Sequence, residues 1–162
     1  MRVPAANLLG GVEGQGFRML MEQLPKERLV IAWQAMGMIE GALEATVEHC
    51  KQRKMFGGTL FDQQNTKFKL AECKTRATVA KTFLYHCTEQ LLAEKLDAST
   101  ASMAKLFVTE TQAFVVDECL QLFGGYGYML EYPIAEMYKD ARAFRIYGGA
   151  SEIMKLLIAR SI

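Results

Sequence analysis

Histidine is scarce in this chain, because only His49 and His86 occur among its 162 residues. A di-iron site in a helical bundle needs Glu-x-x-His pairs, but Thr46 and Phe83 stand three residues before the two histidines. The chain also lacks the G-x-S-x-G elbow of serine hydrolases. The GGYG of residues 124–127 follows a helical pattern rather than a strand, so it does not imply a dinucleotide fold. We therefore expect no metal site and no serine triad.

Long hydrophobic runs and an excess of one charge are absent as well. No run approaches the ~20 apolar residues of a membrane span, and the net charge is only +1 with both signs mixed along the chain. We expect neither a membrane span nor a nucleic-acid-binding surface. The N-terminus lacks the apolar core of a signal peptide and is typical of an entry loop within a larger protein. No CxxC occurs, which favours free buried thiols in a reducing compartment for the four cysteines, Cys50, Cys73, Cys87 and Cys119.

Long segments repeat apolar residues at helical spacing, and the only prolines stand at positions 4, 25 and 133. The pattern predicts a first helix from Pro25 to roughly residue 54 and a second from about residue 62 to 95. A third ends at Gly124, a short one follows Pro133, and the last begins near Ser151. No segment alternates convincingly as a strand would, apart from a short ambiguous piece over residues 144–147. We predict one all-α domain over residues 1–162, an antiparallel up-down four-helix bundle with short extra helices at the C-terminal end.

The same spacing predicts which residues of the long helices face inward. In the first helix these are Leu29, Ala32, Trp33, Met36, Ile39, Leu43 and Val47. In the second and third helices they are Phe68, Ala71, Ala80, Leu84, Cys87 and Leu91, and Met103, Leu106, Phe107, Phe114 and Leu120. Asp97 or Ser99 is the predicted N-cap of the third helix.

Four blocks of the sequence resemble the C-terminal domain of acyl-CoA dehydrogenases, in the family's order and spacing. They are KERLVIA, KQRKMFGGTLFDQQNTKFKLAE, CLQLFGGYGYMLEYPIAEMYKDAR and IYGGASEIMKLLIAR. The resemblance covers nearly the whole chain and is closest to the long-chain type. The family's proteins are longer, with an N-terminal helical domain and a middle β-domain before this bundle, and neither is seen here.

The resemblance implies dehydrogenation of an acyl-CoA thioester to the trans-2-enoyl-CoA, as in fatty-acid β-oxidation, with FAD taking the β-hydride. It also implies an electron-transfer flavoprotein as electron acceptor, a homotetramer or dimer that shares FAD across an interface, and a bacterial cytoplasm or mitochondrial matrix. We expect the isolated chain to be inactive, because the domains with most of the flavin contacts are missing from it.

The resemblance assigns the catalytic base to Glu27. Many members carry the base in the loop where this chain has Gly148, whereas long-chain and isovaleryl-type members supply it from a first-helix stretch similar to LPKERLVIA. The two glycines, Gly148 and Gly149, then leave room for this carboxylate, and the amide of Gly148 is free to hydrogen-bond the thioester carbonyl. The alternative is structural, because an acidic residue near a helix start is favoured by the macrodipole alone.

Further contacts follow from the resemblance. It implies substrate contacts for Arg28 and Gly149, and cofactor contacts for Arg53, Phe56, Gln64, Gln121, Gly125, Ser151 and Glu152. The guanidinium of Arg53 would hold the FAD pyrophosphate of a neighbouring subunit through its paired donors. Structural alternatives stay open, since Arg53 and Gly125 can serve as C-terminal caps and residues 151–152 as a plain helix start.

Two other functions remain open. One is an isovaleryl-type or other branched-chain dehydrogenase. The other is a non-catalytic helical oligomerisation or binding module, which is favoured because Ala150 stands where relatives usually have threonine.

Overall fold

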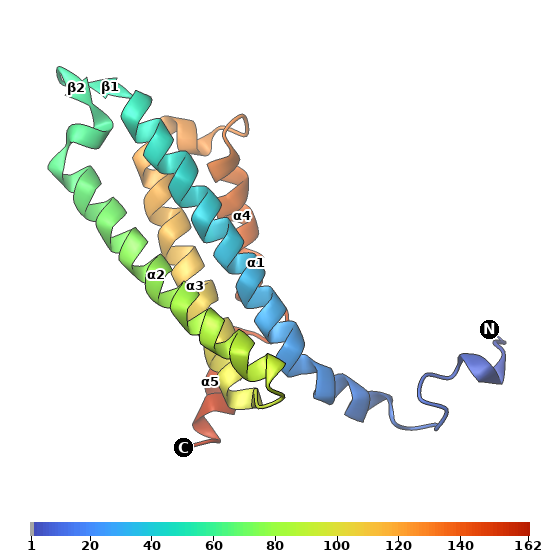
Figure 1. The fold of residues 1–162 in the computed structure, drawn as a ribbon. Helices are drawn as coiled ribbons and strands as arrows, with labels where there is room; N and C mark the ends of the chain where they lie inside the picture. Colours follow the sequence, from blue (N-terminus) through green and yellow to red (C-terminus); the bar gives the residue numbers. More distant parts are fainter. Residues whose placement is uncertain (1) are drawn as a thin grey trace.

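The computed structural model describes residues 2–162 of the chain, which fold as a bundle of long helices (Figure 1). The described residues form five α-helices: α1 (Gly16–Gln52), α2 (Gln64–Leu92), α3 (Ala98–Phe123), α4 (Pro133–Phe144) and α5 (Ser151–Ala159). Short 3-10 turns are η1 (Ala5–Asn7), η2 (Leu60–Asp62) and η3 (Gly124–Tyr128). Strands β1 (Lys54–Met55) and β2 (Gly58–Thr59) pair antiparallel. The predicted all-α up-down bundle is confirmed.

Helix α3 lies at the centre of the bundle and packs against α1, α2, α4 and α5. Its buried face consists mainly of small and polar residues: Ala101, Ser102, Ala104, Lys105, Val108, Thr109, Thr111, Gln112, Val115, Val116, Cys119 and Phe123. The predicted inward positions of Met103 and Phe107 are wrong, since these side chains are 38% and 42% exposed. Helix axes approach closely only where small side chains lie between them, so a helix with several neighbours buries its small residues and leaves some large ones outside.

The inward faces of α1 and α2 are predicted better. Leu29, Ala32, Met36 and Ile39 of α1 are buried, as expected. In α2 the buried residues follow one stripe of three- and four-residue steps: Thr66, Leu70, Cys73, Ala77, Ala80, Leu84 and Cys87. Phe68 lies off this stripe and is 63% exposed, so its predicted inward position is wrong, as is that of Ala71.

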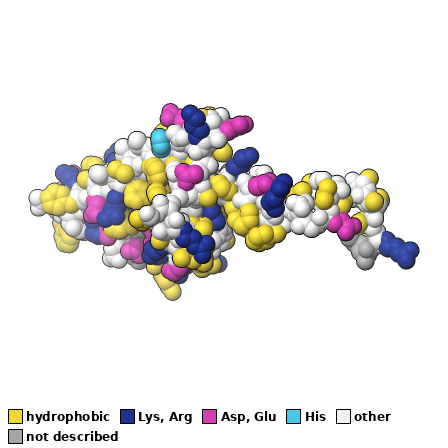
Figure 2. Space-filling model, turned by 90° about the horizontal axis from the view of Figure 1, so that it is seen from below, with side chains coloured by type: hydrophobic (Ala, Val, Ile, Leu, Met, Phe, Trp, Pro, Cys, Tyr) yellow, Lys and Arg dark blue, Asp and Glu magenta, His cyan; other side chains and the backbone are white. Residues whose placement is uncertain are grey.

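Helix α1 begins at Gly16, nine residues before the predicted start, and Pro25 lies inside it. Residues 19–24 are mostly good helix formers, and the missing N–H of Pro25 deprives only one carbonyl, that of Met21, of its helical partner. The first part of α1 and the residues before it project from the bundle (Figures 1 and 2). Glu27 therefore lies about three turns inside α1, so the interpretation of Glu27 as a helix-start residue is wrong.

Local caps set the other helix boundaries. The Asp97 carboxylate accepts hydrogen bonds from the backbone amides of Ser99 and Thr100, both at 2.8 Å, which makes Asp97 the N-cap of α3. Helix α3 ends at Gly124, with φ +59°. The β1–β2 hairpin was not predicted. Its two turn residues, Phe56 and Gly57, both have positive φ, which is the geometry of a two-residue hairpin turn.

All four cysteines are free and buried, as predicted. Burial raises the pKa of the Cys50 thiol to about 11. Within residues 2–162, no three His, Cys, Asp or Glu side chains cluster as metal ligands would. No helix in the described part is both long and apolar enough to traverse a bilayer.

Candidate functional site

In the loop between α4 and α5, several backbone amides lack a backbone acceptor within the described residues. Gly148 and Gly149 have φ values of +63° and +101°, a conformation that side chains with a β-carbon rarely adopt. The amides of Tyr147 and Ser151 donate to the carbonyls of Ala143 and Arg145. In the described chain, none of the three backbone amides of residues 148–150 donates to a backbone carbonyl. Three adjacent donors are therefore available to a ligand.

This loop lies against α1 on the face that carries Glu27. A β-carbon at Gly148 would overlap Cδ1 of Ile31. Ile31 follows Glu27 by four residues, and helical side chains lean toward the N-terminus, so the two share a face. The space beside Gly148 is thus filled by Ile31 rather than left empty, which corrects the expectation that two glycines leave it open. The carboxylate of Glu27 itself is exposed, one turn away.

Two charged residues of α3 form hydrogen bonds with the loop and its flanks. The ammonium of Lys105 is completely buried and donates a hydrogen bond of 2.7 Å to the carbonyl of Gly149. The Glu110 carboxylate accepts hydrogen bonds from the Ser151 hydroxyl, at 2.8 Å, and from Nε of Arg145, at 3.0 Å. Neither Lys105 nor Glu110 is predicted from the sequence. The available signal was a pair of opposite charges within the mostly apolar stretch that forms α3.

Arg28 is buried in the same region. Its Nη1 donates to the hydroxyl of Ser102 at 3.3 Å, and its Nε has no partner within the described residues. Burial lowers the pKa of the Arg28 guanidinium. Burial, reinforced by the charge of Arg28, also lowers the pKa of Lys105. Two cations thus lie under the loop, where their field favours negative charge near the free amides.

A second group of predicted residues meets at the other end of the bundle. Arg53, Gln121 and Gly125 line a hollow of about 500 Å³, together with His49 and Tyr126. The guanidinium of Arg53 lies 5.4 Å from the ring centroid of Tyr126 and forms no ion pair within the described residues. Apart from the adjoining backbone, no atom of the described residues lies within 4 Å of the β-carbon position at Gly125, so a ligand can approach the backbone there. An unpaired guanidinium beside open backbone fits a diphosphate.

The floor of this hollow is aromatic. The ring of His49 stacks on Phe123, with centroids 4.1 Å apart and planes inclined by 17°. Burial, and then the charge of Arg53, lowers the pKa of His49. A neutral imidazole leaves Arg53 as the cation of the hollow, which suits a flat ligand with an anionic group.

The remaining predicted residues are placed less directly. Phe56 is 89% exposed at the hairpin tip, and Gln64 is exposed at the start of α2; both belong to the hollow's end of the bundle but do not line it. Glu152 is exposed in the first turn of α5. The hydroxyl of Ser151 donates its proton to Glu110, so in this conformation it has no proton to donate to a cofactor.

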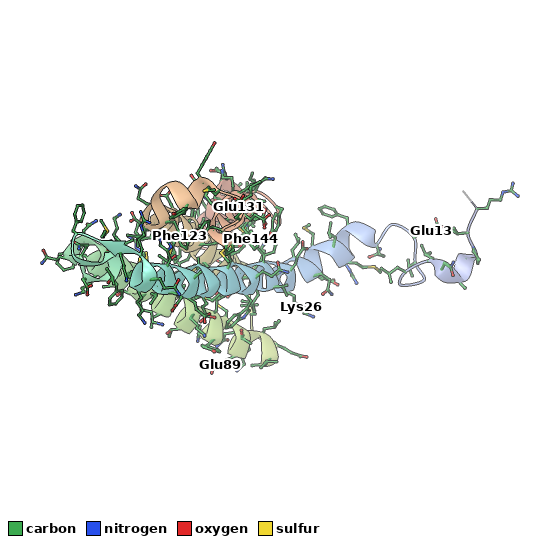
Figure 3. The ribbon with its side chains drawn as sticks, turned by 90° about the horizontal axis from the view of Figure 1, so that it is seen from above. Glu13, Lys26, Glu89, Phe123, Glu131 and Phe144 are labelled. Atoms are coloured by element: carbon green, nitrogen blue, oxygen red, sulfur yellow. The ribbon has the colours of Figure 1, made fainter. Side chains whose placement is uncertain are left out.

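The two groups of residues lie far apart. Glu27 and Arg53 are separated by about 40 Å along α1, at 1.5 Å per residue. Figure 3 shows Lys26, next to Glu27, toward one end of the bundle and Phe123 toward the other. A single chain therefore does not bring the glycine loop and the hollow to one small molecule.

The fold and the two groups define a helical-bundle domain with a loop of unbonded backbone amides at one end and a hollow lined by Arg53 at the other. The chain belongs to the family described as acyl-CoA dehydrogenase, C-terminal domain, which it matches over residues 14–162. It is 49% identical over 162 residues to the mitochondrial long-chain specific acyl-CoA dehydrogenase of Mus musculus, covering 100% of this chain and 37% of that protein.

Solved structures of acyl-CoA dehydrogenases have the same fold as this chain. The acyl-CoA dehydrogenase from Geobacillus kaustophilus superposes with a TM-score of 0.94 at 44% identity, over 98% of this chain and 42% of that one. A chain in a structure titled as the electron transferring flavoprotein of Acidaminococcus fermentans matches with a TM-score of 0.89 at 34% identity, over 93% of this chain and 40% of that one. The chain thus spans less than half the length of these relatives.

Proposed function

We propose that this chain supplies the C-terminal part of a flavin-dependent acyl-CoA dehydrogenase, which converts an acyl-CoA thioester into the trans-2-enoyl-CoA. The observation that carries the proposal is the packing of Gly148 on Ile31, one turn from Glu27. The loop lacks a carboxylate of its own, and an exposed carboxylate stands on the helix face that the loop touches. This arrangement suits a base that comes from α1.

The chemistry follows from these positions. The α-proton of a thioester is weakly acidic, so its removal needs a base and donors aimed at the developing negative charge on the carbonyl oxygen. Glu27 takes this proton, and the amide of Gly148 donates to the thioester oxygen. Arg28 and Gly149 lie on the substrate side, where the buried charge of Arg28 favours the enolate-like state. FAD, when bound, supplies the acceptor for the β-hydride.

Cofactor binding is divided between the two ends of the bundle. Arg53 holds the diphosphate, and Gln121 and Gly125 the adenylate half, with Phe56 and Gln64 at the rim. Ser151 and Glu152 border the cofactor at the other end. Because about 40 Å separates these ends along α1, each complete site needs a second copy of the chain, which supports a homotetramer or dimer.

The surface between α1 and α2 supports such self-association. A groove of about 1100 Å³ is lined by Glu40, Glu44, Glu48 and Lys51 of α1 and by Lys67, Lys74 and Lys81 of α2, and within the chain Lys81 pairs with Glu40 at 2.6 Å. A two-fold axis would let the remaining charges of the groove, Glu44 and Glu48 on α1 and Lys67 and Lys74 on α2, pair between two copies.

The identity to the mouse long-chain enzyme supports a long-chain substrate, with an isovaleryl-type or other branched-chain substrate as the nearest alternative. An electron-transfer flavoprotein is the proposed electron acceptor, and the mitochondrial matrix or a bacterial cytoplasm the proposed compartment. A non-catalytic oligomerisation or binding module is the second candidate, favoured by Ala150 and by the engagement of the Ser151 hydroxyl with Glu110.

The test compares wild type and Glu27→Gln in the full-length flavoprotein, by the bleaching of flavin absorbance on addition of palmitoyl-CoA. We expect the wild type to bleach and Glu27→Gln to bind the ligand without bleaching. Glu22→Gln is the matched control, because Glu22 is an exposed glutamate on the same helix, pairs with Arg18 and lies more than one turn before Glu27. Equal bleaching in Glu27→Gln would remove Glu27 from the reaction, and no bleaching in the wild type would favour the binding module. Comparison with isovaleryl-CoA decides the substrate class.

A further inference from the structure

We propose that Lys105 is a positioning residue that orients the glycine loop for the thioester carbonyl, an inference that rests on the proposed function. Its completely buried ammonium donates to the carbonyl of Gly149 at 2.7 Å, across 44 residues of sequence. Lysine is almost never fully buried unless it has a partner. Here the only hydrogen-bond partner in the described chain is a loop carbonyl, and no carboxylate lies within ion-pair distance.

The cost of this burial points to a role beyond packing. Removing an ammonium from water is expensive, and an apolar side chain of similar length would fill the same space without that cost. Burial and the neighbouring Arg28 both lower the pKa of Lys105, while Glu110 raises it in part. The ammonium is thus kept in a buried position where its one hydrogen-bond partner in the described chain is the Gly149 carbonyl.

Peptide geometry explains what the hydrogen bond does. In a trans peptide the C=O and the following N–H point in opposite directions. All the described peptides are trans. Because Lys105 holds the Gly149 oxygen toward α3, the N–H of Ala150 is turned away from α3. Rotation of this peptide would change ψ of Gly149 and φ of Ala150, so the Gly148 segment of the loop would shift relative to α5.

Glu110 fixes the flanks of the same loop. It lies five residues after Lys105 on α3 and accepts from Ser151 on one side and Arg145 on the other. Together with the contact between Gly148 and Ile31, the loop is held at four points over residues 145–151. Of these four contacts, only the hydrogen bond from Lys105 is made to the peptide that joins Gly149 to Ala150.

The test uses the full-length flavoprotein with Lys105→Met, which keeps the length of the side chain and removes the donor. Lys69→Met is the matched control, because Lys69 pairs with Glu118, which lies about 20 Å from Lys105 along α3. Three quantities are measured: the bleaching rate at saturating palmitoyl-CoA, the Kd for that ligand, and hydrogen exchange of residues 145–152.

We expect the flavin of Lys105→Met to bleach at least about tenfold more slowly than that of wild type, since a misaligned donor to a developing oxyanion costs at least this much. The Kd should stay within about threefold, because the contact acts on the transition state rather than on ground-state binding. Residues 145–152 should exchange faster while α1 keeps its wild-type exchange, and Lys69→Met should match wild type. Lys105→Arg, which keeps a charged donor, should recover part of the rate.

Bleaching and loop exchange at wild-type levels in Lys105→Met would overturn the proposal. If Lys105→Met does not fold, Glu110→Gln decides, since Glu110 is half exposed and the substitution weakens the same loop: a slower rate with unchanged Kd supports the proposal, and a wild-type rate overturns it. If wild type itself does not bleach, the proposed function fails, and the exchange of residues 145–152 alone shows whether Lys105 orients the loop.

Discussion

Gly148 packs against Cδ1 of Ile31 so closely that no β-carbon fits between them. This contact fixes the position of the α4–α5 loop on α1, and it does so one turn from the carboxylate of Glu27. The positive φ of Gly148 adds a second reason for glycine at this position. Steric overlap and backbone strain can be separated by mutation.

Gly148→Ala should lower the free energy of unfolding by about 2 kcal/mol, because it adds a left-handed alanine and an overlap with Ile31. Adding Ile31→Val, which deletes Cδ1, should relieve the overlap but not the strain. Denaturant unfolding of the two single variants and the double variant gives the coupling between the residues. Additive effects would show that the overlap is relieved by a simple shift of Ile31.

Arg53→Met should weaken FAD binding by about tenfold or more, because a paired charge-assisted contact to the diphosphate is lost. The FAD affinity of Arg53→Lys should lie between those of wild type and Arg53→Met, since an ammonium keeps the charge but not the paired donors. Fluorescence of released flavin in the full-length protein measures the effect. Arg18→Met is the control, because Arg18 lies on the projecting part of α1 and should leave FAD affinity unchanged. Tight FAD binding by Arg53→Met would exclude the hollow as the diphosphate site.

Asp97→Ala should lower the free energy of unfolding by about 1 kcal/mol, because it removes the N-cap of α3. Asp97→Asn keeps an acceptor oxygen and should cost much less. Hydrogen bonds from Thr100, together with that from Ser99, lower the pKa of Asp97. The stabilisation is therefore present above the unfolded pKa and is lost as the pH falls through the folded one. Urea midpoints at neutral and acidic pH test both effects.

His49 should make the fold less stable as the pH falls through about 6.5, the pKa of an unfolded histidine. Burial lowers the folded pKa of His49, so the unfolded chain binds the proton first. The loss of stability should level off once the pH is below the pKa of His49 in the folded state. The charge of Arg53 next to the ring increases this loss. In His49→Gln the urea midpoint should change less between pH 7.5 and 5.5 than it does in wild type. An unchanged slope in His49→Gln would place this pH dependence on another group.

The 162-residue chain alone should show no turnover with palmitoyl-CoA and a dye acceptor. Its loop and its hollow are about 40 Å apart along α1, and it spans only 37% of the mouse relative. The steady-state rate should equal that of a heat-denatured sample. Flavin-dependent turnover by the chain itself would show that a complete site forms from these residues.

The sequence by itself determined the order of the helices and most of their ends. Caps and breaks act over a few residues, so Asp97, Gly124, Pro133 and Ser151 mark boundaries that the structure confirms. The four blocks of family resemblance also lie within the sequence, and the family they indicated is the one the chain belongs to.

Apart from the start of α1, which local helix propensity decided, tertiary structure decided the rest. The start of α1 was misplaced because propensity before Pro25 outweighed one lost hydrogen bond, and Phe107 was placed inside because spacing does not tell how many neighbours a helix has. The glycine loop depends on Lys105 and Glu110, which are 44 and 41 residues from their loop partners. Such contacts form only when distant helices pack, so no local pattern reveals that a buried lysine bonds a loop carbonyl or that Ile31 lies beside Gly148.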